Sequence, residues 1–197
     1  MPLLEEVRVP EVVDKELPIK EDRPRWRQTF AELAKTWIQT MVITASLFFL
    51  ITHFAVQGYA VSGSCMEPNL RTGERVLGNK IVYRLDPPNR GDVIVFEYPL
   101  DPKKTYIKRI IGLPGETIEV RAGRVFINNK PLREPYLINV AHGNYGPEKV
   151  KPGRLFVMGD YRDQSNDSRL WGELPISHIR AKAWVRYWPV KRVELMK

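Results

Sequence analysis

The chain has 197 residues, which is room for one domain with a sizeable core beside an anchor segment, but not for two large domains. Its net charge is +8, but the basic residues are scattered among acids, which argues against nucleic-acid binding. The single cysteine, Cys65, excludes an intrachain disulfide. Three scattered histidines without acids or thiols at ligand spacing argue against a zinc or non-haem iron site, and no metal or other cofactor is predicted.

Residues 1–35 are expected to form a cytoplasmic tail that is largely disordered. The first twenty residues mix acids, bases and prolines without useful periodicity. A segment of this composition cannot bury enough apolar surface to fold on its own.

Residues 36–57 are predicted to form a transmembrane helix. The chain carries no formal charge from Thr36 to Val56 and is rich in Ile, Val, Leu and Phe, and about 20 such residues cross a hydrocarbon core of roughly 30 Å. A cleaved signal peptide has only a short basic region before its apolar segment, whereas this segment follows a long polar one. A buried helix of a soluble domain is the alternative interpretation.

Basic residues flank the apolar segment on one side only. Arg23, Arg25, Arg27 and Lys35 precede it, whereas the next basic residue after it is Arg71. The positive-inside rule therefore predicts a cytoplasmic N-terminus, a single pass through the cytoplasmic membrane, and an extracytoplasmic location for the rest of the chain.

Residues 58–197 are predicted to form a mostly β extracytoplasmic catalytic domain, built as a coiled antiparallel sheet or a barrel-like structure. Short runs of β-branched and aromatic residues alternate with Gly and Pro turn signals. The pair Asn128-Asn129 between two such runs predicts a tight hairpin. Strands are expected at residues 75–80, 92–98, 106–111, 117–120, 124–127, 154–158 and 181–188.

Two residues suggest nucleophilic catalysis, in which an attacking group needs a partner base. Cys65 follows the apolar segment closely, and Lys108 lies in a strand-like run where it shares a face with Tyr106 and Ile110 while Arg109 points elsewhere. Burial disfavours the ammonium form, so a buried lysine can act as the base. The alternatives are a small buried thiol and a lysine that protects an edge strand.

Four blocks of the chain resemble those of the bacterial type I signal peptidases, the leader peptidase family. Residues 63–70 resemble the nucleophile block Gly-x-Ser-Met-x-Pro-Thr-Leu, residues 90–96 a conserved strand, and residues 106–116 the block with the catalytic lysine. Residues 159–172 resemble the block Gly-Asp-Asn-Arg-Asp-Asn-Ser-x-Asp-Ser-Arg. The blocks occur in the family's order behind an N-terminal anchor, and together they cover nearly everything from the membrane segment to Pro189.

The resemblance implies a membrane-bound endopeptidase that removes signal peptides from secretory preproteins, in contact with membrane phospholipid. It assigns the base to Lys108 and the position of the catalytic serine to Cys65, so this chain departs from the family by carrying sulfur there. Because sulfur is larger than oxygen, activity below that of the serine form is expected. In a rival alignment Ser64 is the nucleophile and Cys65 is an insertion before Met66.

The resemblance also implies supporting residues around the dyad. The backbone N–H groups of Cys65 and Gly63 would form the oxyanion hole. Ser165 would hydrogen-bond the catalytic lysine, and Asp167 and Arg169 would form a structural ion pair.

Further roles follow from the same blocks. Asp160 and Arg109 are expected to orient the region, whereas Tyr161 and Gln164 replace two common asparagines of the family, which puts any role of those asparagines in doubt. A shallow apolar pocket would accept small residues such as Ala before the cleaved bond. Its expected lining is Tyr59, Val61, Met66, Leu70 and Ile107.

Two other functions compete with this interpretation. A serine-lysine protease of the SOS-repressor type would be soluble and carry a DNA-binding or accessory domain, which the anchor argues against. A catalytically impaired or inactive membrane-tethered homologue that only binds preproteins is the second, because position 65 is not serine. Cleavage of a preprotein after an Ala-x-Ala sequence would distinguish them.

Overall fold

The computed structural model describes residues 25–138 and 142–196, so residues 1–24 of the expected tail lie outside the described part. The chain divides into two compact units, Met1–Ala45 and Ser46–Lys197, which are treated separately.

The helix α1 spans Arg25–Phe54, and its part Glu32–Phe54 is long and apolar enough to cross a membrane. It begins before residue 36, inside the expected tail, and ends before residue 57 because strand pairing starts at Val56. Threonine hydroxyls within it, at Thr36 and Thr40, donate to carbonyls four residues earlier. These bonds satisfy polar groups inside an otherwise apolar helix.

The rest of the described chain is mostly β, as the sequence predicted, and every strand pairing in it is antiparallel. The larger sheet has the order β1-β2-β11-β3-β4-β9-β10, with β12 paired to β11. The sheet is open rather than closed into a barrel. Its strands are β1 (Val56–Ala60), β2 (Arg75–Asn79), β3 (Val93–Tyr98), β4 (Asp101–Gly112), β9 (Arg154–Met158), β10 (Leu174–Pro175), β11 (Ile179–Trp188) and β12 (Glu194–Leu195).

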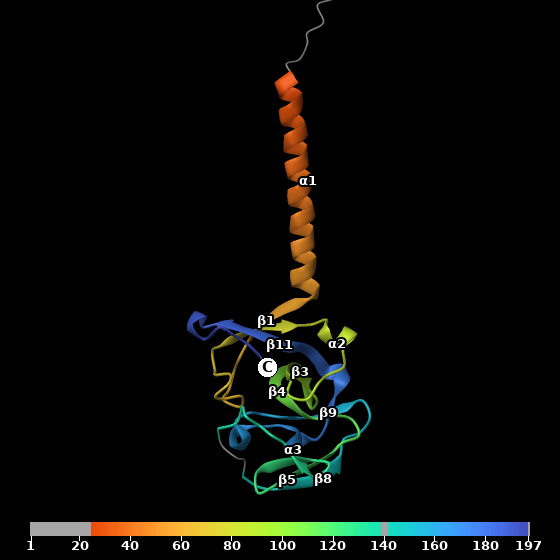
Figure 1. The fold of residues 1–197 in the computed structure, drawn as a ribbon, viewed down its shortest axis with the longest axis vertical. Helices are drawn as coiled ribbons and strands as arrows, with labels where there is room; N and C mark the ends of the chain where they lie inside the picture. Colours follow the sequence, from red (N-terminus) through yellow and green to blue (C-terminus); the bar gives the residue numbers. More distant parts are fainter. Residues whose placement is uncertain (1–24, 139–141, 197) are drawn as a thin grey trace, which may run out of the picture. The chain divides into compact units, whose positions relative to one another are not determined.

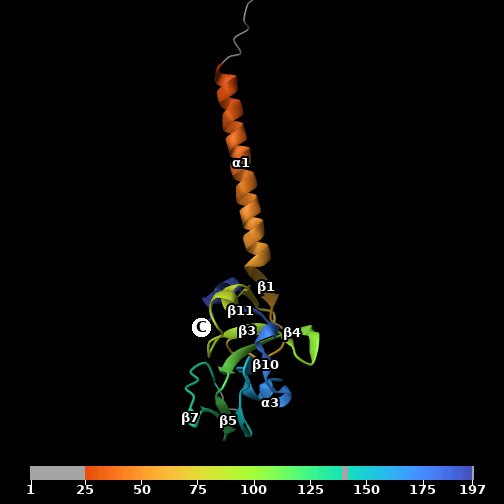
Figure 2. The ribbon, with the colours of Figure 1, turned by 90° about the vertical axis from the view of Figure 1, so that its right-hand side faces the viewer.

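A second open sheet has the order β7-β6-β5-β8 and lies at the end of this unit away from β1 (Figures 1 and 2). Its strands are β5 (Thr117–Arg121), β6 (Arg124–Ile127), β7 (Lys130–Pro131) and β8 (Tyr145–Lys149). Short helices join the strands. They are α2 (Val82–Leu85), η1 (Arg162–Gln164), α3 (Ser168–Trp171), η2 (Ile176–His178) and η3 (Val190–Arg192).

The predicted turn at Asn128-Asn129 is present between β6 and β7. Both residues have positive φ, 50° and 65°, and Ile127 pairs with Lys130. Asparagine tolerates this left-handed backbone better than most residues, which is why it serves in a two-residue hairpin.

The middle of the larger sheet is buried on both faces. All of Val93, Ile94, Val95 and Phe96 in β3 are at most 2% exposed. Alternate residues therefore enter two different core clusters, Val93 with Val61 and Val76, and Ile94 with Phe96 and other residues. The continuous apolar run in the sequence reflects this two-sided burial. Strand β4 pairs with β3 and is therefore held in place by a strand that is packed on both faces.

Candidate active site

The β3–β4 pairing places Lys108 at the centre of the larger sheet, opposite Ile94. The side chain is only 2% exposed, and its Nζ lies 2.9 Å from Cys65 Sγ. The same Nζ donates a hydrogen bond of 3.1 Å to the carbonyl of Ile107 and lies 5.4 Å from the centre of the Tyr106 ring. The two residues that the sequence selected as nucleophile and base are thus in direct contact.

Cys65 lies in the loop between β1 and β2 and is half-buried. Its carbonyl accepts a 3.0 Å hydrogen bond from the Tyr161 N–H, which ties this loop to the segment after β9. The neighbouring Ser64 hydroxyl donates instead to Oε1 of Gln164, at 3.1 Å. The contact with Lys108 therefore belongs to Cys65, which favours the alignment that puts Cys65 at the attacking position.

The loop before Cys65 offers unused backbone donors. In the part of the chain that the structure describes, the N–H groups of Gly63 and Cys65 make no hydrogen bond to the protein. Gly63 has φ 92°, a left-handed conformation that favours glycine, and a Cβ there would meet no atom within 4 Å. Glycine is thus required by the backbone turn, not by lack of space.

Ser165 does not make the hydrogen bond to Lys108 that the resemblance implies. Its hydroxyl is buried and has no hydrogen-bond partner among the described residues. The residue packs into the space left by the missing side chain of Gly159, where a Cβ would overlap Ser165 and lie 2.5 Å from the Cys65 carbonyl oxygen. The close packing of Gly159, Ser165 and Cys65 accounts for this position of the hydroxyl.

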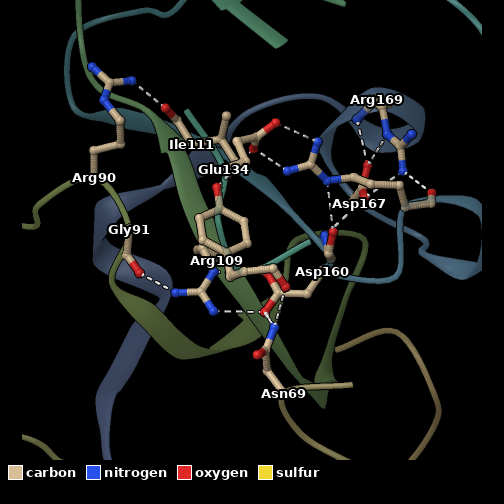
Figure 3. A network of polar contacts seen from close by, with 12 residues as sticks. Asn69, Arg90, Gly91, Arg109, Ile111, Glu134, Asp160, Asp167 and Arg169 are labelled. Atoms are coloured by element: carbon tan, nitrogen blue, oxygen red, sulfur yellow. Dashed lines mark hydrogen bonds and ion pairs between the residues drawn. The ribbon is translucent and has the colours of Figure 1, made fainter. Parts of the chain in front are cut away.

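Arg109, the residue after the lysine, points to the other face of β4 and binds Asp160 in a buried bidentate pair (Figure 3). The two nitrogen–oxygen distances are 2.9 and 2.7 Å. Asn69 donates to the same carboxylate at 2.8 Å, and the guanidinium lies 4.1 Å from the centre of the Tyr136 ring. This pair joins β4 to the segment after β9.

Two further ion pairs involve residues of the same segment (Figure 3). Asp167 and Arg169 form the expected pair at 2.9 Å, and Asp167 also accepts the N–H of Gly159 at 3.1 Å. The sequence did not indicate the second pair, between Glu134 and Arg162, which are far apart in the chain. Together these contacts hold the segment that contacts Cys65.

A cleft of about 390 Å³ opens beside Cys65 and Lys108. Of the expected lining, Tyr59, Val61 and Ile107 border it. Burial raises the pKa of Tyr59, so its phenol stays neutral there. Lining residues that sequence reasoning missed include Val76, Val95, Gln164 and Asn166, because membership of a pocket depends on which strands become neighbours.

Met66 and Leu70 were predicted to line the pocket, and this is wrong. Both are fully buried in the core cluster that contains Val61 and Val76. The Leu70 N–H donates to the Met66 carbonyl at 2.8 Å, so the chain makes a helical turn directly after Cys65. That turn directs both side chains into the core.

This chain is similar to known proteins of one family. The family described as "Signal peptidase, peptidase S26" matches residues 34–188. Signal peptidase I of Leptolyngbya laminosa is 40% identical over 164 residues, covering 79% of this chain and 80% of the relative. Probable signal peptidase I-2 of Synechocystis sp. is 38% identical over 183 residues, covering 90% and 81%.

A crystal structure of a signal peptidase I from Enterococcus faecalis has 30% identity and a TM-score of 0.45, and covers 49% of this chain and 97% of that one. The family match extends over most of the 197 residues, and the curated relatives are aligned over most of their own length. The chain therefore belongs to the signal peptidase family, peptidase S26.

Proposed function

We propose that this chain is a membrane-anchored signal peptidase I that cleaves signal peptides from secretory preproteins with a Cys65–Lys108 dyad. The observation that carries the proposal is the 2.9 Å contact between the thiol and the buried amine beside an open cleft, in a member of the signal peptidase family. The apolar helix Glu32–Phe54 supports a single membrane anchor. The basic residues before it support a cytoplasmic N-terminus and an extracytoplasmic catalytic domain from about residue 58 onward.

The mechanism begins with proton transfer. The Lys108 amine, in its neutral form, accepts the proton of the Cys65 thiol as sulfur attacks the scissile carbonyl carbon. Lys108 then returns that proton to the leaving amine, and the C–N bond breaks to leave a thioester. A water molecule attacks the thioester while Lys108 takes its proton, and the carboxylate product leaves as the thiol is restored.

Two backbone groups on the loop are positioned to stabilise the developing oxyanion by hydrogen bonds. The unbonded N–H groups of Gly63 and Cys65 are available as donors, and one such donor contributes about 3 kcal/mol to a transition state. The apolar side chains of Tyr59, Val61 and Ile107 beside the dyad support a preference for small residues before the cleaved bond.

The test is cleavage of a preprotein with an Ala-x-Ala site by the full chain in neutral detergent. We expect a single cut after that site, its loss in Cys65→Ala, and near-normal cleavage in Ser64→Ala because Ser64 contacts Gln164 rather than Lys108. Cys65→Ser should raise the rate, since oxygen fits the position that the family uses. A small thiol reagent should inactivate the chain but not Cys65→Ser.

The outcomes separate the alternatives. An inactive Ser64→Ala beside an active Cys65→Ala would assign the nucleophile to Ser64. Preprotein binding without a cut, restored by Cys65→Ser, would identify a membrane-tethered binding homologue that has lost catalysis.

A further inference from the structure

A second groove lies beside the catalytic cleft and is lined in part by residues of β1, α2 and β11. These three elements lie together at one end of the domain (Figure 1). The groove has a volume of about 570 Å³, and it shares Tyr59 and Thr105 with the cleft but includes neither Cys65 nor Lys108. The cations that line it are Lys80, Arg84 and Arg180. It is thus a separate site with basic walls.

Among the described residues that line this groove, basic side chains outnumber acidic ones. Among the described residues that line it, the only carboxylate is Glu97, which pairs with Arg180. Lys80 Nζ donates to the carbonyl of His53 at 3.3 Å, and within the described ranges neither Lys80 nor Arg84 forms an ion pair. Two cations therefore remain to bind an anion.

The groove begins where the apolar helix ends. The N–H of Lys80 donates to the carbonyl of Ala55 at 2.9 Å, and Ala55 directly follows the span Glu32–Phe54. Residues just beyond an apolar span lie at the level of the lipid headgroups. Next to Arg84, Leu85 is 81% exposed, an apolar side chain beside a cation as in segments that rest on a bilayer surface.

We propose that the groove lined by Lys80, Arg84 and Arg180 binds the phosphate of an anionic phospholipid headgroup. The inference rests on the proposed membrane anchor, not on the proposed cleavage. Lysine and arginine form charge-assisted hydrogen bonds with phosphate oxygens. A bound headgroup would hold the β1–β2 pair against the bilayer surface, and β1 leads directly into the loop that contains Cys65.

The experiment measures binding of a short-chain phosphatidylglycerol to the full chain in neutral detergent by calorimetry. Short-chain phosphatidylcholine is the zwitterionic comparison, and inorganic phosphate tests for a site that takes any free anion. We expect saturable binding of the phosphatidylglycerol. Lys80→Gln/Arg84→Gln should weaken it on the order of tenfold or more, because each basic residue near a lipid surface contributes roughly 1 kcal/mol.

The matched control is Lys130→Gln/Lys149→Gln, which removes the same charge from exposed positions on the smaller sheet. It should bind phosphatidylglycerol like the parent chain. Equal weakening in both double variants, or equal binding of phosphatidylcholine, would overturn the proposal. Binding of inorganic phosphate as tight as that of the lipid would replace it with a free-anion site.

Cleavage in neutral detergent separates this proposal from the enzymatic one. The groove variant should cleave the preprotein at the parent rate there, because neither residue borders the dyad. A chain that binds the lipid through the groove but never cleaves would leave the groove assigned and refute the peptidase. Cleavage without saturable lipid binding would support the peptidase and overturn the proposed lipid groove.

Discussion

Lys108 and Arg109 are consecutive basic residues, both buried, with opposite surroundings. Arg109 has a carboxylate partner in Asp160, whereas Lys108 forms no ion pair within the part of the chain that the structure describes and contacts the Cys65 thiol instead. A buried amine without a carboxylate does little for stability, because its desolvation is not repaid. This difference supports the proposal that Arg109 stabilises the structure and Lys108 acts in the chemistry.

Lys108→Met tests that assignment. The substitution keeps most of the side-chain volume but removes the base, so cleavage should fall by at least about 100-fold. The thermal melting temperature should not fall, because no charge is left unpaired. The exposed Lys104 provides the control, and Lys104→Met should cleave normally. Parent-like turnover of Lys108→Met would remove the dyad from the mechanism.

Gly159 provides a second residue-scale prediction. A Cβ there would lie 2.5 Å from the Cys65 carbonyl oxygen, which is backbone and cannot move aside cheaply. Gly159→Ala should therefore displace the nucleophile loop, lower cleavage about tenfold or more, and destabilise the fold by about 1–3 kcal/mol. The measurements are initial rate and urea unfolding.

Ser165→Ala is the comparison for Gly159→Ala. It removes a hydroxyl that has no hydrogen-bond partner in the described structure and adds no bulk. Stability should be unchanged or slightly higher. If Gly159→Ala cleaved as well as the parent, the tight contact between these segments would not position the nucleophile.

At the scale of elements, the central contact joins β4 to the segment between β9 and α3 through Arg109 and Asp160. Asp160→Ala would remove the buried carboxylate that balances the guanidinium charge, and the expected cost is about 3–5 kcal/mol. The double variant Arg109→Met/Asp160→Leu should recover much of that loss, because apolar side chains often replace a buried pair without penalty. Urea unfolding in detergent measures both, and equal stability of single and double variants would contradict the account.

Sequence patterns located most strands because β-branched and aromatic runs lie between clear turn signals. β6 matches its expected bounds, and the Asn128-Asn129 turn has the positive φ values that its residues favour. The runs listed as strands did not include β1, whose sequence Val-Gln-Gly-Tyr-Ala is short and is interrupted by Gln57 and Gly58. They also did not include β8, whose Tyr-Gly-Pro-Glu-Lys sequence has few strand-forming residues and depends on pairing with β5.

The site could be predicted only in part for a similar reason. The dyad followed from the resemblance, because the blocks around Cys65 and Lys108 are local in sequence. The Glu134–Arg162 pair and the turn that buries Met66 depend on tertiary packing, and nothing local indicates them. The direction of a side chain in such a turn depends on which part of the core the turn packs against.

For the whole molecule, the domain after the helix has an exposed apolar surface of its own. Trp184 and Trp188 on β11 and Val190 and Val193 after it are each about half exposed or more. Large apolar side chains exposed close together in the chain are typical of a membrane or partner site. We expect a chain lacking residues 1–54, which keeps all of β1, to cleave preprotein but to need detergent or lipid for its full rate.

The measurement is the cleavage rate of the truncated chain with and without a neutral amphiphile. Trp184→Ser/Trp188→Ser should lower the response to amphiphile without lowering the basal rate. An equal rate of the truncated chain in both conditions would show that its active site does not depend on an apolar surface.

The register of β3 and β4 has a consequence for how the length of this chain can vary. Ile94 lies opposite Lys108 and Val93 opposite Arg109, and side chains alternate with a period of two. One residue inserted between Thr105 and Lys108 would turn the guanidinium toward the thiol and the amine toward Asp160. Two inserted residues would return each side chain to its original face of the strand. Natural length variation should therefore gather at the hairpin tip around Leu100, where an odd change is absorbed without exchanging the directions of the two basic side chains.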